Sequence, residues 1–140
     1  MTFAGAAEPR PSGDQERESE RVLVVDDEPS IRHVISRVLL DEGYFVHEAS
    51  DGLEALELIR TGEPAMDVVV SDVVMPRLNG VELLQEASRT RPSLPFILIS
   101  GYGNEELTQR GISPPCALLS KPFPSERLLA EVRRCIARRP

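Results

Sequence analysis

The segment Val22-Leu23-Val24-Val25-Asp26-Asp27 decides the fold of this chain, because an unbroken run of apolar residues ends directly in two acids. Such a run is typical of a strand buried on both faces, as in parallel sheets. Three later runs also end at a polar side chain: Val68-Val69-Val70-Ser71 before Asp72, Phe96-Ile97-Leu98-Ile99 before Ser100, and Ala117-Leu118-Leu119-Ser120 before Lys121. Parallel strands would bring these polar ends to one edge of the sheet, where ligands bind in open α/β folds.

From Arg21 onward, short apolar runs alternate with segments of helical period, which is the pattern of five βα units around a parallel sheet. The remaining strand is expected at 44–49, and the strand that contains the Val68–Ser71 run is expected over 66–71. Helices are expected from Pro29 to Gly43, at 52–60, at 80–89, from Asn104, and at 125–137. The fold class is therefore α/β, with a single doubly wound five-stranded parallel sheet.

The helical spacing also predicts which side chains face the sheet. The inward set comprises Ile31, Val34, Ile35, Val38 and Leu39 in the first helix, Leu53, Leu56 and Ile59 in the second, and Leu128, Leu129, Val132 and Ile136 in the last. Residues 1–20 have few large apolar groups and are expected to form a flexible leader. The folded domain is expected over residues 21–138.

Composition excludes several classes of protein. The chain has 140 residues, enough for one domain, and 41% hydrophobic residues can form a real core. The net charge of -7 disfavours binding to nucleic acid, whose phosphates need a basic surface. No apolar run approaches the roughly 18 residues that span a bilayer, and no secretion signal begins the chain. We expect a soluble, cytoplasmic protein in which Cys116 and Cys135 are free thiols.

The polar strand ends suit a metal-assisted reaction with phosphate. Two adjacent carboxylates, Asp26 and Asp27, and a third from Asp72 would repel one another by about 4 kcal/mol per close pair at an effective dielectric of about 20. A cation must balance them, and Mg²⁺ prefers such hard oxygen ligands. Lys121, the only lysine in the chain, completes the charge balance. Asp72 stands alone at its strand end and is the expected nucleophile, with Ser100 and Lys121 contacting the transferred group.

These motifs resemble the receiver domain of two-component response regulators. The matching segments are Val24-Val25-Asp26-Asp27-Glu28, Ser71-Asp72-Val73-Val74-Met75-Pro76 with Asn79-Gly80, Ile99-Ser100-Gly101-Tyr102, and Ser120-Lys121-Pro122-Phe123. The resemblance implies the strand order 2-1-3-4-5 and a cis peptide bond before Pro122. It also implies that Asp72 is the phosphoacceptor, that Mg²⁺ binds Asp27, Asp72 and the carbonyl of Val74, and that Asp26 acts through metal-bound water.

By the same resemblance, the phosphoryl donor is a phosphohistidine on a histidine kinase or a histidine phosphotransfer protein. The donor is expected to dock around Pro29, Ile31 and Phe123, which flank the acceptor. No output segment follows residue 137, so the expected output is contact with an unknown protein target. His33 and His47 are interpreted as exposed or half-exposed scaffold residues.

The chain departs from the family pattern at Leu118 and Val74, and other features indicate one branch of the family. Leu118 stands where many members have an aromatic residue that couples to the hydroxyl group, and Tyr102 is the candidate replacement. Val74 is apolar where some members help to orient the attacking water, which predicts a long-lived phosphoform. The Ser-Gly-Tyr sequence at 100–102 and the arginine-rich end are more similar to the carboxyl-terminal receivers of hybrid histidine kinases than to transcription-factor receivers.

Three other functions remain open from the residues. An Mg²⁺-dependent aspartyl phosphatase of the haloacid dehalogenase type would use similar acids, although it needs an Asp-x-Asp arrangement that Asp26-Asp27-Glu28 lacks. A flavodoxin-like electron carrier would need hydroxyl-rich N–H donors where this chain has an acidic first loop. A receiver that docks without phosphorylation is the third alternative.

Overall fold

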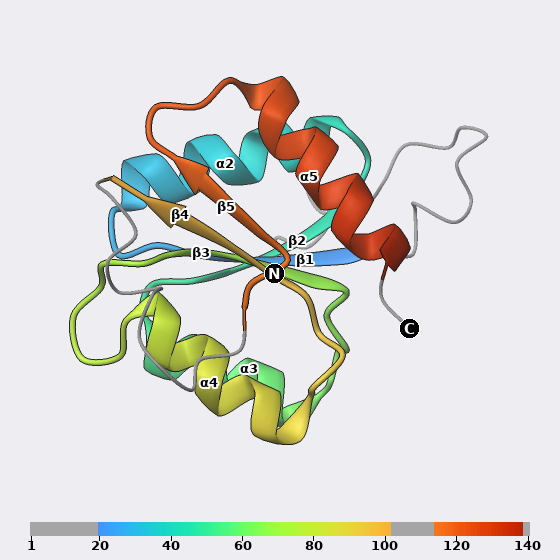
Figure 1. Ribbon diagram of the computed structural model, residues 1–140. Coiled ribbons are helices and arrows are strands. Elements are labelled where there is room, and N and C mark those ends of the chain that lie inside the picture. The colour runs from blue at the N-terminus through green and yellow to red at the C-terminus, as the bar shows by residue number, and fades with distance from the viewer. Residues whose placement is uncertain (1–19, 102–113, 139–140) are drawn as a thin grey trace.

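The computed structural model describes residues 20–101 and 114–138. Five parallel strands form one sheet in the order β2-β1-β3-β4-β5, as the family resemblance implied (Figure 1). The strands are β1 Arg21–Val25, β2 Phe45–Ala49, β3 Val68–Asp72, β4 Phe96–Ser100 and β5 Ala117–Ser120. The predicted fold class is therefore confirmed.

Four helices of the described residues cover the two faces of the sheet. They are α2 Pro29–Asp41, α3 Gly52–Thr61, α4 Gly80–Thr90 and α5 Ser125–Arg138. Figure 1 shows α2 and α5 on one face and α3 and α4 on the other. The expected leader, apart from residue 20, and the helix expected from Asn104 lie outside the described residues, as does Tyr102.

The sheet is buried on both faces because side chains alternate along each strand. In β1, Val22 and Val24 join the core beneath α2 and α5, whereas Leu23 and Val25 join the core on the side of α3 and α4. All four are at most 1% exposed. This two-sided burial is the physical reason for the continuous apolar run that precedes Asp26.

The helices begin where the sequence supplies capping groups. Pro29 occupies the first turn of α2, and the Asp51 side chain accepts a hydrogen bond from the Glu54 N–H at the start of α3. Asn79 and Glu82 form a reciprocal capping box at the start of α4. These three starts lie just beyond the carboxyl ends of β1, β2 and β3, which brings helix N-termini to the edge predicted to carry the chemistry.

Three side chains expected to face the sheet are exposed instead. Ile31, Val34 and Leu53 are 37%, 63% and 50% exposed. Each residue turns an α-helix by about 100°, so Val34 and Leu53 lie outside the narrow stripe centred on the buried residues of α2 and α3. Ile31 lies in the first turn of α2, just after the end of β1. The prediction was wrong because it assigned too wide a stripe to short helices.

The expectation of free thiols is also wrong. Cys116 and Cys135 are joined in a disulfide across 19 positions of sequence, with their Cα atoms 6.0 Å apart. Cys116 immediately precedes β5, and Cys135 lies near the end of α5. Because α5 runs back along the sheet after β5, its last turns return to the level where β5 begins (Figure 1). Separation along the chain therefore gave no guide to separation in space.

Candidate functional site

The polar residues just after β1 and at the end of β3 meet at the carboxyl edge of the sheet. Asp26, Asp27 and Asp72 each offer a carboxylate oxygen, and these oxygens all lie within 4.8 Å of one another. Asp26 and Asp72 are buried, whereas Asp27 is exposed. The sheet topology creates this cluster, because β1 and β3 are parallel neighbours whose ends lie at the same level.

Asp26 carries a carboxyl group whose hydrogen bonding is incomplete. Its Oδ1 accepts a hydrogen bond of 2.9 Å from the Glu28 N–H, but its buried Oδ2 finds no partner among the described residues. Burial raises the pKa of Asp26, and the nearby carboxylates of Asp72 and Asp27 act in the same direction. A buried oxygen without a donor is costly, so this atom suits a cation or a bound water.

Asp72 faces both the acids and the lysine. It is 7% exposed, and Lys121 Nζ lies 3.6 Å from its Oδ2. Burial is the largest influence and raises the pKa of Asp72, while the Lys121 ammonium and a hydrogen bond from the Val74 N–H oppose that rise. The Asp72 carboxylate therefore sits in a partly dehydrated site that one cation balances incompletely.

Ser100 and Lys121 come from neighbouring strand ends. Ser100 is paired in register with Ser120, and the Lys121 N–H donates a 2.9 Å hydrogen bond to the Ser100 carbonyl. Ser100 is buried at the last position of β4. The Lys121–Pro122 peptide bond is cis, as expected. The hydroxyl and the ammonium are thus held by adjacent backbone segments at the same edge as Asp72.

The loop after Asp72 is fixed by close backbone contacts. The Val73 N–H donates to the Ile99 carbonyl at 2.9 Å, and the Gly80 N–H donates to the Val73 carbonyl at 2.8 Å. A Cβ on Gly80 would lie 2.3 Å from the Asp72 carbonyl oxygen, so only glycine permits this approach. Val74 is exposed beside the acceptor, but the role expected for its carbonyl stays a prediction.

Sequence reasoning missed Arg32. Its Nη1 donates to the Asp26 carbonyl at 2.7 Å and its Nε to Glu48 Oε1 at 2.9 Å. The Arg32 side chain is only 14% exposed, and it ties α2 and β2 to the backbone of the acidic pair. One arginine in an amphipathic helix carries no local signal of this contact.

Sequence reasoning also missed the contact between Arg77 and Asp51, which joins the loop after β3 to the start of α3. Arg77 has a left-handed φ of 68°, which is uncommon for a residue other than glycine. The short sequence Pro76-Arg77-Leu78-Asn79 does signal a turn, but not its partner.

An apolar groove of about 390 Å³ runs beside Lys121. Its lining includes Ile31 and Val34 of α2, together with Pro122 and Phe123 of the loop before α5. The two α2 side chains that the sheet does not bury therefore form one wall of a groove adjacent to the acidic site.

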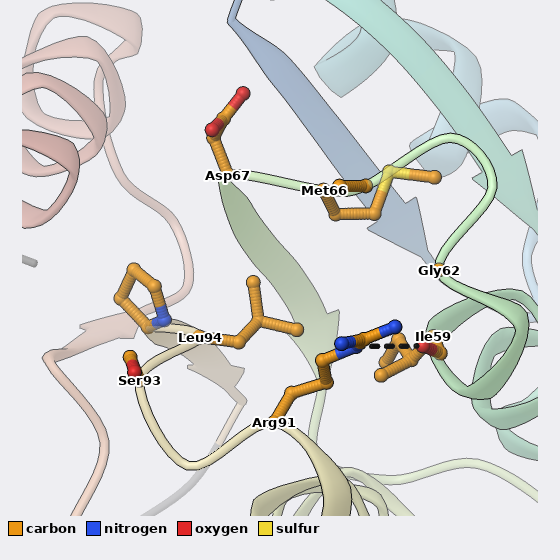
Figure 2. A pocket seen from close by; sticks show the side chains of 9 residues that line it. Ile59, Gly62, Met66, Asp67, Arg91, Ser93 and Leu94 are labelled. Carbon is orange, nitrogen blue, oxygen red and sulfur yellow. Dashed lines mark hydrogen bonds between the residues drawn. The ribbon is translucent and has the colours of Figure 1, made fainter.

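A second hollow lies at the opposite edge of the sheet, and Figure 2 shows the residues that line it. There Arg91 Nε donates to the Ile59 carbonyl, at 3.4 Å, in the last turn of α3. Asp67 Oδ2 accepts a 2.7 Å hydrogen bond from the Arg21 N–H. These contacts satisfy a carbonyl at the end of α3 and an N–H at the start of β1. The polar side chains in this hollow therefore have a structural role.

The fold and the acidic edge define a class of small α/β proteins. In this class, carboxylate oxygens that can bind a metal ion lie at the carboxyl ends of a sheet with the strand order 2-1-3-4-5. The family model described as the response regulator receiver domain matches residues 22–133, and the chain belongs to this family. It is a receiver domain of two-component systems. The phosphatase alternative gains no support.

Curated relatives include both a kinase and response regulators. The chain is 39% identical over 119 residues to the sensor kinase CckA of Brucella abortus, covering 84% of this chain and 13% of CckA. It is equally identical over 119 residues to the response regulator MprA of Mycobacterium sp., covering 84% of this chain and 51% of MprA. The chain thus spans about half the length of MprA and about an eighth of the length of CckA.

Solved structures agree with this assignment. A response regulator receiver domain protein from Clostridium thermocellum superposes with a TM-score of 0.77 at 30% identity, covering 85% of this chain and 95% of that one. The receiver domain of the hybrid histidine kinase CckA gives 0.69 at 34% identity, covering 83% and 98%. Receiver domains are signalling modules that bind Mg²⁺ at an acidic cluster of this kind. In the described residues no helix is both long and apolar enough to cross a bilayer.

Proposed function

We propose that this chain accepts a phosphoryl group from a phosphohistidine onto Asp72 and thereby changes its contacts with a target protein. One observation carries the proposal: three carboxylates lie within 4.8 Å of one another, and Lys121 Nζ lies 3.6 Å from Asp72 Oδ2. The donor would be a histidine kinase or a histidine phosphotransfer protein, the partners expected for this family.

The acidic residues fit a magnesium ion. Asp26, Asp27, Asp72 and the Val74 carbonyl would hold it, since all offer the hard oxygen ligands that Mg²⁺ prefers. The orphaned Oδ2 of Asp26 supports this assignment, because a metal or its bound water would satisfy that buried atom. When bound, Mg²⁺ supplies positive charge that offsets the carboxylates and an incoming phosphate.

In the transfer, a carboxylate oxygen of Asp72 attacks the phosphorus of the donor. A P–O bond forms to Asp72 while the P–N bond to the imidazole breaks, and the ring nitrogen keeps the electron pair and gains a proton. Lys121 offers its ammonium, and Ser100 its hydroxyl, to the phosphoryl oxygens on the same edge. The protein thus acts mainly by positioning and charge, so we propose no turnover beyond accepting and slowly losing the phosphoryl group.

The new contacts would also drive the switch. Shifting a two-state equilibrium from 1:99 to 99:1 takes about 5.5 kcal/mol of differential stabilisation. Bonds from Ser100 and Lys121 to the phosphoryl group would contribute much of it. Position 118 in β5 holds a partly buried leucine. The switch would therefore proceed without the aromatic side chain that many receivers have at this position.

The donor would dock on the apolar groove beside Lys121. Ile31 and Phe123, two of the residues expected at the docking site, line this groove, and Pro29, the third, begins the helix that forms one wall. Exposed apolar surface next to a reactive group suits a protein partner. We further propose that residues 21–138 form the functional unit and act in the cytoplasm, where ATP supplies phosphohistidine.

The deciding experiment is incubation with a small-molecule phosphodonor and Mg²⁺, read by intact mass. Wild type should gain one phosphoryl group, and Asp72→Ala should gain none. Asp41→Asn is the matched control, since Asp41 is an exposed acid on α2 away from the cluster, and it should react like wild type. An unmodified wild-type protein, or a modified Asp72→Ala protein, would refute the proposal.

The phosphoform should be long-lived because the exposed Val74 cannot orient a water beside Asp72. Substitution Val74→Asn should shorten the lifetime several-fold by supplying a polar side chain there. The lifetime is read from the decay of the phosphorylated mass after the donor is removed. A wild-type half-life of seconds would contradict this part of the proposal.

A further inference from the structure

The disulfide between Cys116 and Cys135 joins the start of β5 to the end of α5. The proposed function, on which this step rests, places the chain in the cytoplasm, where glutathione and thioredoxin keep thiols reduced. Disulfides in such compartments are usually transient, catalytic or redox-sensing rather than permanent. A purely stabilising role is therefore not the expected one for this disulfide.

A pocket of about 580 Å³ reaches the disulfide. Both cysteines line it, together with Leu84 and Ser88 of α4 and Arg138 of α5. Cys135 is fully buried, whereas Cys116 is only partly buried. Cys116 is therefore the more accessible residue of the two.

Two arginines surround the bond on the side of α5. Arg134 Nη2 donates a 2.9 Å hydrogen bond to the Cys116 carbonyl, and Arg138 lines the pocket. Arg134 also pairs with Glu131, at 2.6 Å between Nη2 and Oε1. The guanidinium group of Arg138 would attract an anionic thiol such as glutathione, whose thiolate is the form that exchanges with disulfides.

The two cysteines are held in place without the disulfide. The Cys116 N–H donates to the Phe96 carbonyl at 2.8 Å, which extends the pairing of β4 with β5. Cys135 lies on the buried face of α5 with Val132 and Ile136, in the core against the sheet. Reduction would therefore leave both thiols within reach of each other, and the bond could form again without refolding.

We propose that Cys116 and Cys135 form a reversible thiol–disulfide exchange site for glutathione-class thiols, and that the attachment of α5 to β5 depends on its redox state. A glutathione thiolate attacks the Cys116 sulfur, the protein S–S bond breaks, and Cys135 leaves as a thiolate that takes a proton. A second glutathione thiolate attacks the glutathione sulfur of the mixed disulfide and releases Cys116. Two glutathione thiols are oxidised to one glutathione disulfide, and the protein disulfide gains two electrons. Oxidation is the reverse, with glutathione disulfide as the oxidant.

The test equilibrates the folded full chain at different ratios of glutathione to glutathione disulfide. Free thiols are then alkylated and counted by intact mass. The disulfide and dithiol forms should interconvert reversibly without denaturant. If the disulfide is reduced only in denaturant, or if dithiol protein never forms the bond at any ratio, the exchange site is refuted.

Hydrogen exchange of wild type and Cys116→Ser tests the effect on α5. Reduction should speed the exchange of α5 amides in wild type and leave those of α3 unchanged, while Cys116→Ser should show no redox response. Loss of a cross-link over a loop of this size should also lower the thermal midpoint by about 10 °C. Equal α5 exchange in both redox states would overturn the coupling.

No phosphodonor is present in these measurements, so their failure leaves the assignment of Asp72 intact. Conversely, an inert Asp72 would leave the exchange chemistry measurable by mass.

Discussion

The two edges of the sheet handle their polar groups in opposite ways. At the amino edge, Arg91 donates to the Ile59 carbonyl (Figure 2), and Asp67 accepts a hydrogen bond from the Arg21 N–H. Charged side chains at this edge therefore satisfy backbone groups. At the carboxyl edge, Asp26 keeps a buried oxygen without a described partner, and burial raises the pKa values of Asp26 and Asp72. The difference indicates that the acidic cluster at the carboxyl edge, unlike the contacts of Asp67 and Arg91, leaves a buried polar atom that a further charged group could satisfy.

The largest expected effect comes from removing the metal. A chelator should slow phosphorylation of wild type by about 100-fold or more, because the carboxylates then repel the incoming phosphate. Asp67→Asn, at the amino edge, should keep the full dependence on Mg²⁺. The rate of mass gain from a small phosphodonor measures both. Phosphorylation that proceeds equally with and without chelator would remove the distinction between the edges.

The next effect is on stability. Without metal, Asp26→Asn should stabilise the protein by roughly 1–2 kcal/mol at pH 7, because it removes a buried charge near two other acids. Raised folded-state pKa values mean that the folded state binds protons more tightly than the unfolded state. Stability of the metal-free protein should therefore fall as pH rises from 3.8, the ordinary pKa of an aspartate, through the higher folded-state pKa values of Asp26 and Asp72.

Urea denaturation across this pH range checks the second prediction. Asp26→Asn should flatten the pH dependence and should gain less stability from Mg²⁺ than wild type does. If Asp26→Asn is less stable than wild type at neutral pH without metal, the buried Asp26 carboxylate does not destabilise the metal-free protein.

A smaller effect is expected at Arg32. Arg32→Gln should weaken Mg²⁺ binding by roughly tenfold, because second-layer contacts orient metal ligands and here one holds the Asp26 carbonyl. Arg37→Gln is the matched control, since Arg37 lies on α2 in an exposed pair with Asp41. Calorimetric titration with Mg²⁺ measures both variants. Equal affinities would show that Arg32 supports the fold only.

The smallest effect is expected at the amino edge. Arg91→Ala should cost about 0.5–1 kcal/mol of unfolding free energy, since it removes one long hydrogen bond to a helix end. Phosphorylation by the small donor should be unchanged. A large loss of phosphorylation would mean that the two edges are coupled.

Much of the fold could be predicted from the sequence. The apolar runs of β1, β3 and β4, the helix starts at Pro29 and Gly80, and the strand order implied by the family resemblance all agree with the structure. Errors arose where an inward face was assigned from spacing alone, as at Val34 and Leu53. Short helices against a twisted sheet bury a narrower stripe than their apolar spacing indicates.

The candidate site divides in the same way. Asp26, Asp27, Asp72, Ser100 and Lys121 could be proposed because each follows a strand, and parallel strands align their ends. Arg32 could not, because its contact with the Asp26 carbonyl depends on how α2 lies over the strand ends. The Cys116–Cys135 bond was misjudged for a similar reason.

The amino-acid sequence by itself determined the strands, their parallel arrangement and the chemistry at their ends, since alternation, apolar runs and chain polarity are local properties. Only the tertiary structure decided the disulfide, the contact of Arg32 and the groove formed by Ile31 and Val34. Each of these depends on distances between segments that are remote along the chain, and those distances exist only once the helices have packed on the sheet.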